Sequence, residues 1–196
     1  MKIQPLGIDG CFLINHDVFP DERGLFREWF KASALENMGI EFKIAQANFS
    51  VSKKGVIRGL HYSLAPEGQS KIVTCVQGGI LDYLVDIRVG SPTYLEKVCI
   101  ELESDSGNSV LIASGVAHGF SVPRETSAIS YLTTSEFSSS FEKGINPLDK
   151  KLNVDWRLPE STSSVISKAD LDARDFEFAL HNDLLPMYSA GKLHDA

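Results

Sequence analysis

Short apolar runs separated by turn residues fill the middle of the chain. The runs are rich in Val, Ile, Leu and Tyr, and Gly, Ser, Pro, Asp and Asn separate them. Along 98–103, apolar residues alternate with Cys and Glu, which is the period of two of a strand with one face in water. Many short, evenly spaced strands indicate a sandwich or a small barrel. Five runs are predicted to be strands: 70–79, 79–90, 95–104, 108–120 and 127–137.

Helical patterns are confined to the two flanks. The stretch "FKASALENMG" at 30–39 predicts a short helix that ends at Gly39, and 167–184 predicts a longer helix that begins at Ser167. No internal repeat, low-complexity tract or Pro-rich linker divides the chain. The pattern therefore predicts one mainly β domain over 1–196, with short flanking helices.

Composition and charge narrow the class of protein. With 196 residues, of which 43% are hydrophobic and 23% charged, the chain has ordinary globular composition and is long enough to bury a core. The net charge of -7 argues against general nucleic-acid binding, which needs a basic face. An anionic ligand could bind only where a few cations gather, and the candidates are Arg23, Arg58 and Lys71.

The sequence carries no targeting or disulfide pattern. The N-terminal residues lack the apolar segment of a secretory signal, and no stretch approaches the ~20 apolar residues of a membrane helix. We therefore expect a cytoplasmic protein without membrane contact. Cys11, Cys75 and Cys99 show neither disulfide nor zinc-site spacing, and they are predicted to be small buried hydrophobes.

The segment 55–79 concentrates the candidate chemistry. His61 ends a short apolar run, with Arg58 before it and Lys71 on the next predicted strand. Arg58 and His61 can share one face of a strand only if the chain bends at Gly59, which a glycine permits. A base and two cations could then share one cavity. The simpler alternative is a structural histidine in a barrel wall whose hydrogen bonds are satisfied within the protein.

A metal site at His61 is not favoured. Small β-barrels that hold a divalent ion usually supply two histidines at i and i+2, a carboxylate and a later histidine. Here the i+2 residue is Ser63, while Glu67 and His118 are spread over a loop and a distant strand. Lys71 would also place a positive charge beside the ion. We predict neither a metal nor a cofactor.

Three further polar residues have ordinary structural explanations. His118 in "GVAHGF" fits a turn, and Tyr131 in "AISYLTTSEF" fits a core strand. Ser167 and Asp170 have the spacing of a capping box, in which the acid serves the helix N-terminus. The local pattern leaves the role of all three open.

Several segments together resemble the dTDP-4-dehydrorhamnose 3,5-epimerase family. The resemblance runs from about residue 5 to about residue 186, and "RGLHY" followed by "VDIRVGSPT" is its most specific part. "LLPMY" near the end resembles a subset from antibiotic-sugar and cell-wall pathways. The other matching segments are "FPDERGLFREWF", "QANFSVSKKGVIRGLHY", "SGVAHGF" and "GINPLD".

The resemblance implies a fold, an assembly and a reaction. The fold is a cupin jelly roll (a double-stranded β-helix) without a metal, in a homodimer whose N-terminal strand crosses to the partner. The substrate is a dTDP-4-keto-6-deoxy-hexose, whose C4 ketone acidifies the hydrogens at C3 and C5. Removal of one gives an enolate, and protonation of the opposite face inverts the centre. The reaction needs a base, an acid on the far side and a cation near O4.

By the same resemblance, four residues carry the chemistry. His61 is the base, because an imidazole titrates near neutral pH. Asp170 holds the tautomer of His61 and stabilises the imidazolium. Lys71 lies near the charge that develops on O4, and Tyr131 is the acid on the opposite face of the sugar.

The resemblance also implies a set of binding residues. Arg58 and His118 would line the diphosphate and sugar region. The segment 23–28 would cross to the partner and hold the nucleotide, with its phenylalanine ring against the base. The implied substrate-binding residues are Arg23, Phe26, Glu28, Gln46, Asn48, Arg58, His118, Phe137 and Glu142.

Two positions depart from the family pattern. Phe137 stands where a tyrosine is usual, and Ala169 stands where a lysine or arginine is usual, with Lys168 one place earlier. The presence of Tyr131 favours inversion at both C3 and C5. A 3-epimerase or a 5-epimerase is the nearest alternative, followed by a non-catalytic nucleotide-sugar-binding cupin and a metal-dependent cupin oxygenase or isomerase.

Overall fold

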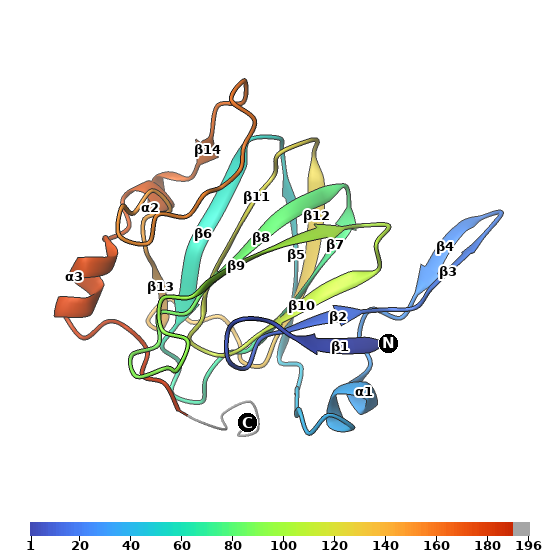
Figure 1. The fold of residues 1–196 in the computed structure, drawn as a ribbon, viewed down its shortest axis with the longest axis horizontal. Coiled ribbons are helices and arrows are strands. Elements are labelled where there is room, and N and C mark those ends of the chain that lie inside the picture. Colours follow the sequence, from blue (N-terminus) through green and yellow to red (C-terminus); the bar gives the residue numbers. More distant parts are fainter. Residues whose placement is uncertain (190–196) are drawn as a thin grey trace.

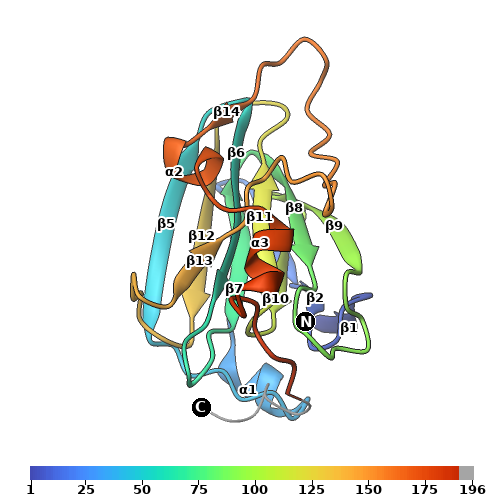
Figure 2. The same ribbon diagram turned by 90° about the vertical axis from the view of Figure 1, so that its left-hand side faces the viewer.

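Two antiparallel sheets packed face to face form the body of the protein (Figures 1 and 2). The computed structural model describes residues 1–189, so the end of the predicted domain, 190–196, lies outside the described residues. The first sheet contains, in spatial order, β1 (Lys2–Pro5), β2 (Phe12–Asn15), β10 (Asn108–Ile112), β7 (Lys71–Gln77), β12 (Ser127–Thr133) and β5 (Gln46–Ser52). The second contains β13 (Glu142–Gly144), β6 (Val56–Ser63), β11 (Ala117–Ser121), β8 (Gly79–Val85) and β9 (Lys97–Glu103), with β14 (Val165–Ile166) paired in parallel to β6. The prediction of a mainly β fold is confirmed.

The core lies between the two sheets. Val73, Leu84, Leu102 and Val110 come from four strands and are fully buried there. Removing one such side chain from water stabilises the fold by roughly 1.5–3 kcal/mol. In β9 the predicted alternation is confirmed, because Leu102 is buried whereas Glu101 is exposed. The inward faces of these four strands therefore build this core.

Two further apolar layers cover the outer faces of the sheets. On the first sheet, Leu35 of α1 (Ala32–Glu36) packs against Ile14 and Ile72. On the second sheet, Trp156 and Phe176 from the C-terminal third pack over β6 and β8. The C-terminal third is thereby fixed beside β6, which is the strand that carries His61.

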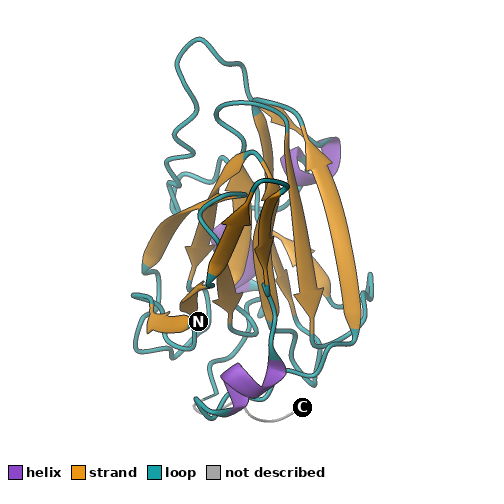
Figure 3. Ribbon diagram, turned by 90° about the vertical axis from the view of Figure 1, so that its right-hand side faces the viewer, coloured by secondary structure: helices purple, strands orange, loops and turns teal. Residues whose placement is uncertain are grey.

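The predicted helix at 167–184 is wrong, because two short helices replace it. They are α2 (Lys168–Leu171) and α3 (Phe176–His181). The Ser167 hydroxyl caps α2, and Asp175 caps α3 by accepting from the Phe178 N–H, so the second cap begins a new helix. The predicted helix at 30–39 is confirmed in part, since α1 is shorter. Figure 3 shows how little helix the fold contains, and among residues 1–189 none is long and apolar enough to cross a membrane.

The run 108–120, predicted as one strand, forms two strands in different sheets. β10 lies in the first sheet and β11 in the second. Between them the Val116 N–H donates to the Ala113 carbonyl, and Gly115 adopts a φ of 79°, which favours glycine. Both strands are apolar because both face a core, so hydrophobicity alone does not reveal that the chain passes from one sheet to the other between them.

A β-hairpin projects from the body beside the first sheet (Figure 1). It consists of β3 (Val18–Asp21) and β4 (Gly24–Arg27). At its base the Arg27 guanidinium donates to the Thr74 hydroxyl and to the Cys75 carbonyl. Phe26, next to Arg27 on the same strand, is 65% exposed. The hairpin is thus anchored at its base and presents an aromatic ring to solvent.

Candidate active site

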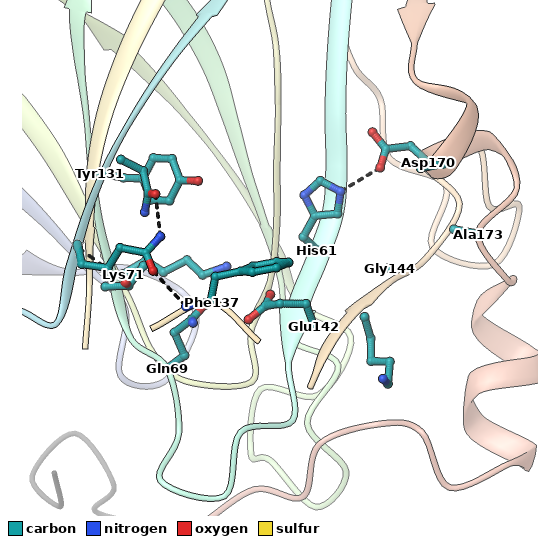
Figure 4. Close-up of a pocket in the computed structure, with 14 residues that line it drawn as sticks. His61, Gln69, Lys71, Tyr131, Phe137, Glu142, Gly144, Asp170 and Ala173 are labelled. Carbon is teal, nitrogen blue, oxygen red and sulfur yellow. Dashed lines mark hydrogen bonds and ion pairs between the residues drawn. The ribbon is translucent and has the colours of Figure 1, made fainter. Parts of the chain in front are cut away.

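A cavity of about 500 Å³ opens between the edges of the two sheets (Figure 4). β5, β7 and β12 contribute from the first sheet, β6 and β13 from the second, and α2 closes one side. Eight of the predicted site residues line the cavity: Gln46, Asn48, His61, Lys71, Tyr131, Phe137, Glu142 and Asp170. The residues come from segments far apart in the sequence, and the jelly-roll order of the strands brings them together.

A second cavity of about 170 Å³ adjoins the first. His61, Lys71 and Tyr131 line both, and Arg58 and His118 join them in the second. Two predicted binding residues therefore lie next to the predicted catalytic ones. Together the two cavities hold ten of the thirteen predicted site residues.

A β-bulge places Arg58 and His61 on the same face of β6. His118 of β11 pairs with His61, but Phe120 pairs with Arg58, so β6 carries one extra residue between the two pairs. Gly59 in the bulge has a φ of 115°, and a Cβ there would lie 2.7 Å from the His118 carbonyl oxygen. The predicted bend at Gly59 is confirmed, and glycine is required for it.

His61 is paired with Asp170 of α2. The His61 Nε2 lies 2.7 Å from the Asp170 Oδ1. Burial works to raise the pKa of Asp170, but hydrogen bonds from His61, Ser167 and the Gly59 N–H outweigh it and hold that pKa below its ordinary value. The carboxylate is therefore an ionised acceptor that faces the His61 Nε2.

The geometry separates the two explanations of Asp170. The Ser167 hydroxyl accepts from the Asp170 N–H, which is the cap of α2. The Asp170 carboxylate, in contrast, faces His61 across the gap between α2 and β6 (Figure 4). The serine supplies the helix cap, and the aspartate side chain is free to pair with the histidine.

Lys71 begins β7 and points into the cavity. Burial lowers the pKa of its ammonium group, and the charge of Glu142 opposes that shift. Glu142 lies on β13, which pairs with the end of β6 beyond His61. The lysine amine is therefore desolvated, and the nearest acidic group that favours its charged form, Glu142, comes from the opposite sheet.

Tyr131 lies on β12, in the sheet opposite His61. Burial raises the pKa of its phenol, Glu142 raises it further, and Arg58 lowers it. The phenol is consequently protonated at neutral pH and can donate a proton. Figure 4 shows Tyr131 and His61 on opposite sides of the cavity.

A chain of polar contacts forms the wall on the side of β5. The Gln46 Nε2 donates to the Asn48 Oδ1 at 2.7 Å, and the Phe137 N–H donates to the Gln46 Oε1 at 2.9 Å. These bonds fix both amide side chains toward the cavity. The Phe137 ring remains exposed at the rim, where it offers an apolar surface.

Three predicted binding residues do not line either cavity. Arg23, Phe26 and Glu28 lie on or beside the projecting hairpin. Glu28 borders a separate small cavity near Asp17 instead. Within the described chain these residues lie apart from the cavity that contains His61.

Several cavity residues were not singled out from the sequence. Gln69 and Thr133 line the larger cavity, as do Lys143 and Ala173. Thr133 lies directly opposite Lys71 in the sheet, so its place follows from the strand register, which the sequence alone does not provide. Among residues 1–189, no three His, Cys, Asp or Glu side chains gather where they could hold a metal ion.

The two packed sheets and the polar cavity between them define an enzyme with the cupin jelly-roll fold. The comparison with protein families is more specific. A family model described as dTDP-4-dehydrorhamnose 3,5-epimerase matches residues 5–177. The chain belongs to this family and is an isomerase, which confirms the resemblance found in the sequence.

Known proteins resemble the chain over almost its whole length. It is 38% identical to a dTDP-4-dehydrorhamnose 3-epimerase of Streptomyces niveus, over 96% of this chain and 90% of that protein. It is 36% identical to a dTDP-4-dehydrorhamnose 3,5-epimerase of Streptomyces griseus, over 95% of this chain and 92% of that protein. A solved 3,5-epimerase of Legionella pneumophila, in complex with dTDP-4-keto-L-rhamnose, superposes with a TM-score of 0.89 at 36% identity, covering 96% of this chain and 99% of that one.

Proposed function

We propose that the protein epimerises a dTDP-4-keto-6-deoxy-hexose at both C3 and C5, in the synthesis of dTDP-L-rhamnose or a related deoxysugar. The observation that carries this proposal is the His61–Asp170 pair, which faces Tyr131 across a cavity that Lys71 also lines. The ligand in the Legionella structure, dTDP-4-keto-L-rhamnose, supports the substrate class.

His61 is the proposed base. In the neutral imidazole, a hydrogen on Nε2 that is donated to Asp170 leaves Nδ1 free to take the proton from C3 or C5. The ionised Asp170 then stabilises the imidazolium that forms. The pair thereby keeps one tautomer before and after the transfer.

Lys71 is the proposed group that stabilises the enolate. Its ammonium is buried and faces the space between the base and the acid. A desolvated cation gains more from an adjacent oxyanion than an exposed one does. Glu142 opposes the effect of burial, which helps the lysine stay charged while the site is empty.

Tyr131 is the proposed acid. The phenol keeps its proton at neutral pH, and it lies on the wall opposite the base. Protonation from that wall delivers hydrogen to the face of the sugar from which His61 did not take it. Inversion, rather than simple exchange, follows from this placement.

The remaining cavity residues are proposed to bind the substrate. Arg58 and His118 would contact the diphosphate and sugar, and Gln46 and Asn48 would contact polar groups along the β5 wall. Phe137 offers its exposed ring at the rim to the nucleotide.

We propose further that a second copy of the chain completes the site. Arg23, Phe26 and Glu28 lie on or beside the hairpin, which projects from the body and could reach another protomer, and none of the three lines the cavity of its own chain. The edge strand β5 also exposes Phe49, at 66%, on the face outside the cavity. Exposed aromatic side chains on an edge strand and on a projecting hairpin are suited to an interface between copies.

The nearest alternative is inversion of a single centre, because the Streptomyces niveus relative is named a 3-epimerase. Incubation with dTDP-4-keto-6-deoxy-glucose in deuterated water, followed by NMR, separates the possibilities. Label and inversion at both C3 and C5 support the proposal, and one labelled centre supports a mono-epimerase. No label at either centre contradicts catalysis and favours a binding protein.

A cytoplasmic location and the lack of metal, cofactor and nucleic-acid partners stay predictions.

A further inference from the structure

The Asp82 carboxylate lies within hydrogen-bond distance of the His118 ring. In the β8–β11 pair Phe120 lies opposite Asp82, so His118 is the diagonal neighbour of Asp82 on the same face. The His118 Nε2 lies 2.7 Å from the Asp82 Oδ2. Nδ1 has no hydrogen-bond partner among residues 1–189, and the ring lines the smaller cavity. Nδ1 is therefore the atom of His118 that is available to a ligand.

Asp82 occupies a core position of β8. Ile80 and Leu84, two residues away on the same face, belong to the apolar cluster between the sheets, and the Asp82 side chain is 0% exposed. Its second oxygen, Oδ1, has no hydrogen-bond partner among the described residues. A half-satisfied carboxylate in an apolar core costs stability, and an apolar side chain would pack there more favourably. Stability of the fold therefore does not explain why an aspartate occupies position 82.

The protonation of the pair follows from its surroundings. Burial raises the pKa of Asp82, and the charge of His118 and its hydrogen bond oppose that rise only in part. A carboxylate anion beside a neutral imidazole would leave a net charge in the core. The stable pair is neutral, with one proton in the shared bond and a second on Nδ1. Nδ1 is then a donor, whichever atom holds the shared proton.

We propose that Asp82 is a positioning residue, which fixes His118 so that its Nδ1–H donates to an anionic oxygen of the substrate. Arg58 and Lys71 line the same small cavity, and their side chains can only donate. Donors from three strands thus surround one space. The oxyanion that fits is either a diphosphate oxygen or the enolate O4. The identity of the substrate in this inference rests on the proposed function.

The two histidine–carboxylate pairs of the site differ in kind. His61 and His118 are direct cross-strand partners, and each Nε2 lies 2.7 Å from its carboxylate. The pKa of Asp170 is lowered, however, while that of Asp82 is raised. Asparagine resembles a protonated aspartate in shape and charge. It can therefore donate to the His118 Nε2 in place of a protonated Asp82, but it cannot replace the ionised Asp170.

The test makes the same substitution in both pairs. We expect Asp170→Asn to lower kcat/KM by about a hundredfold to ten-thousandfold, because the base loses its tautomer. Asp82→Asn should lose at least about tenfold less than Asp170→Asn. Asp82→Leu, which removes the hydrogen bond, should lose about tenfold to a hundredfold while its Tm stays equal or rises. Equal losses in the two asparagine variants would overturn the proposal, as would an unimpaired Asp82→Leu.

An NMR measurement tests the proposal without any substrate. In protein labelled with ¹⁵N-histidine at neutral pH, we expect Nδ1 to be protonated in His118 and unprotonated in His61, with His118→Gln to assign the signals. An unprotonated His118 Nδ1 contradicts the proposal. This result stands even if the wild-type protein turns over no dTDP-sugar, which would refute the proposed function alone.

Binding of dTDP distinguishes the two oxyanions. If His118 contacts the diphosphate, Asp82→Leu weakens dTDP binding; if it contacts the enolate, kcat falls and dTDP affinity is unchanged. Ser121→Ala is the matched control, because Ser121 is buried on β11 and bonds to the Trp156 carbonyl, outside both cavities. A loss in Ser121→Ala equal to that in Asp82→Leu would assign the effect to general damage and overturn the proposal.

Discussion

His61 and Tyr131 approach one cavity from opposite sheets of the jelly roll. β6 carries the histidine and β12 carries the tyrosine, and the cavity lies between them (Figure 4). A sugar ring that fills this cavity presents one face to each residue. In the proposed mechanism, His61 removes a proton from one face and Tyr131 donates its own proton to the opposite face, so the two steps can be examined separately.

Tyr131→Phe should slow net epimerisation more than it slows proton abstraction. The substitution removes the acid but leaves the His61–Asp170 pair intact. We expect deuterium from solvent to enter the substrate at close to the wild-type rate while inverted product forms about a hundredfold more slowly. NMR of the reaction in deuterated water reports both rates. Tyr94→Phe, outside both cavities, is the control. Equal losses in the two rates would contradict this division of roles.

Ser167→Ala separates the helix cap from the histidine pair when it is compared with Asp170→Asn. Loss of the Ser167 cap should lower the free energy of unfolding by about 1 kcal/mol, since the Asp170 N–H loses its partner. The fall in kcat should be much smaller than in Asp170→Asn. Thermal unfolding and steady-state kinetics on both variants check this expectation. If Ser167→Ala were as inactive as Asp170→Asn, the carboxylate would act through the helix rather than through His61.

Arg58→Ala should chiefly weaken binding of the nucleotide. The Arg58 side chain is held by the Ser52 hydroxyl and the Val51 carbonyl, at the edge of the smaller cavity. A charge-assisted contact to phosphate contributes roughly 1.5–3 kcal/mol, so the Kd for dTDP should rise about tenfold or more. Calorimetry measures it. Arg124→Ala, which removes a surface arginine paired with Glu101, should leave the Kd unchanged. An unchanged Kd in Arg58→Ala would remove this residue from the site.

The sequence predicted strands whose apolar faces point into the core, and it missed β5, whose inner face lines the cavity. In β9 the buried residues are apolar, so alternation predicts the strand correctly. In β5 the inward residues Gln46 and Asn48 are polar, while the outward Phe49 is exposed. In β5 the polar side chains face inward and an apolar one faces solvent, so hydrophobic periodicity does not predict this strand.

Within the site, the local sequence pattern predicted only the grouping of His61 with Arg58 and Lys71. The bulge that aligns Arg58 with His61 was anticipated from Gly59. The partner of His61 was not, because Asp170 lies more than a hundred residues away and resembles a cap in the local sequence. The family resemblance supplied it. The local pattern assigned no role to Asp82. Its position was nevertheless visible in the sequence, because an acid between Ile80 and Leu84 interrupts an alternation of apolar residues.

Lys71→Met should raise stability and abolish activity. Burial lowers the pKa of Lys71, so the folded state gives up this proton below the ordinary value of 10.5, at which the unfolded chain holds it. Between the lowered pKa and 10.5 the unfolded state binds more protons, and stability rises with pH. Below the lowered pKa both states hold the proton, and the full cost of the buried charge remains. We expect Lys71→Met to raise the Tm at pH 7 and to remove this alkaline rise. Lys54→Met, at an exposed turn, is the control, and a lowered Tm in Lys71→Met would contradict the expectation.

Mixing two inactive variants should restore activity if the hairpin of one protomer serves the cavity of its partner. His61→Ala keeps an intact hairpin, and a hairpin variant with Arg23→Ala and Phe26→Ala keeps an intact cavity. In a mixed dimer, one cavity then has its own histidine and the hairpin of the other chain. Up to about a quarter of all sites would be complete after the subunits exchange at equal concentrations. A mixture of His61→Ala with Lys71→Met is the control, because both residues line the same cavity of one chain, so no combination is complete. Recovery in the first mixture alone supports the crossed hairpin, whereas recovery in neither means that each chain uses its own hairpin or none.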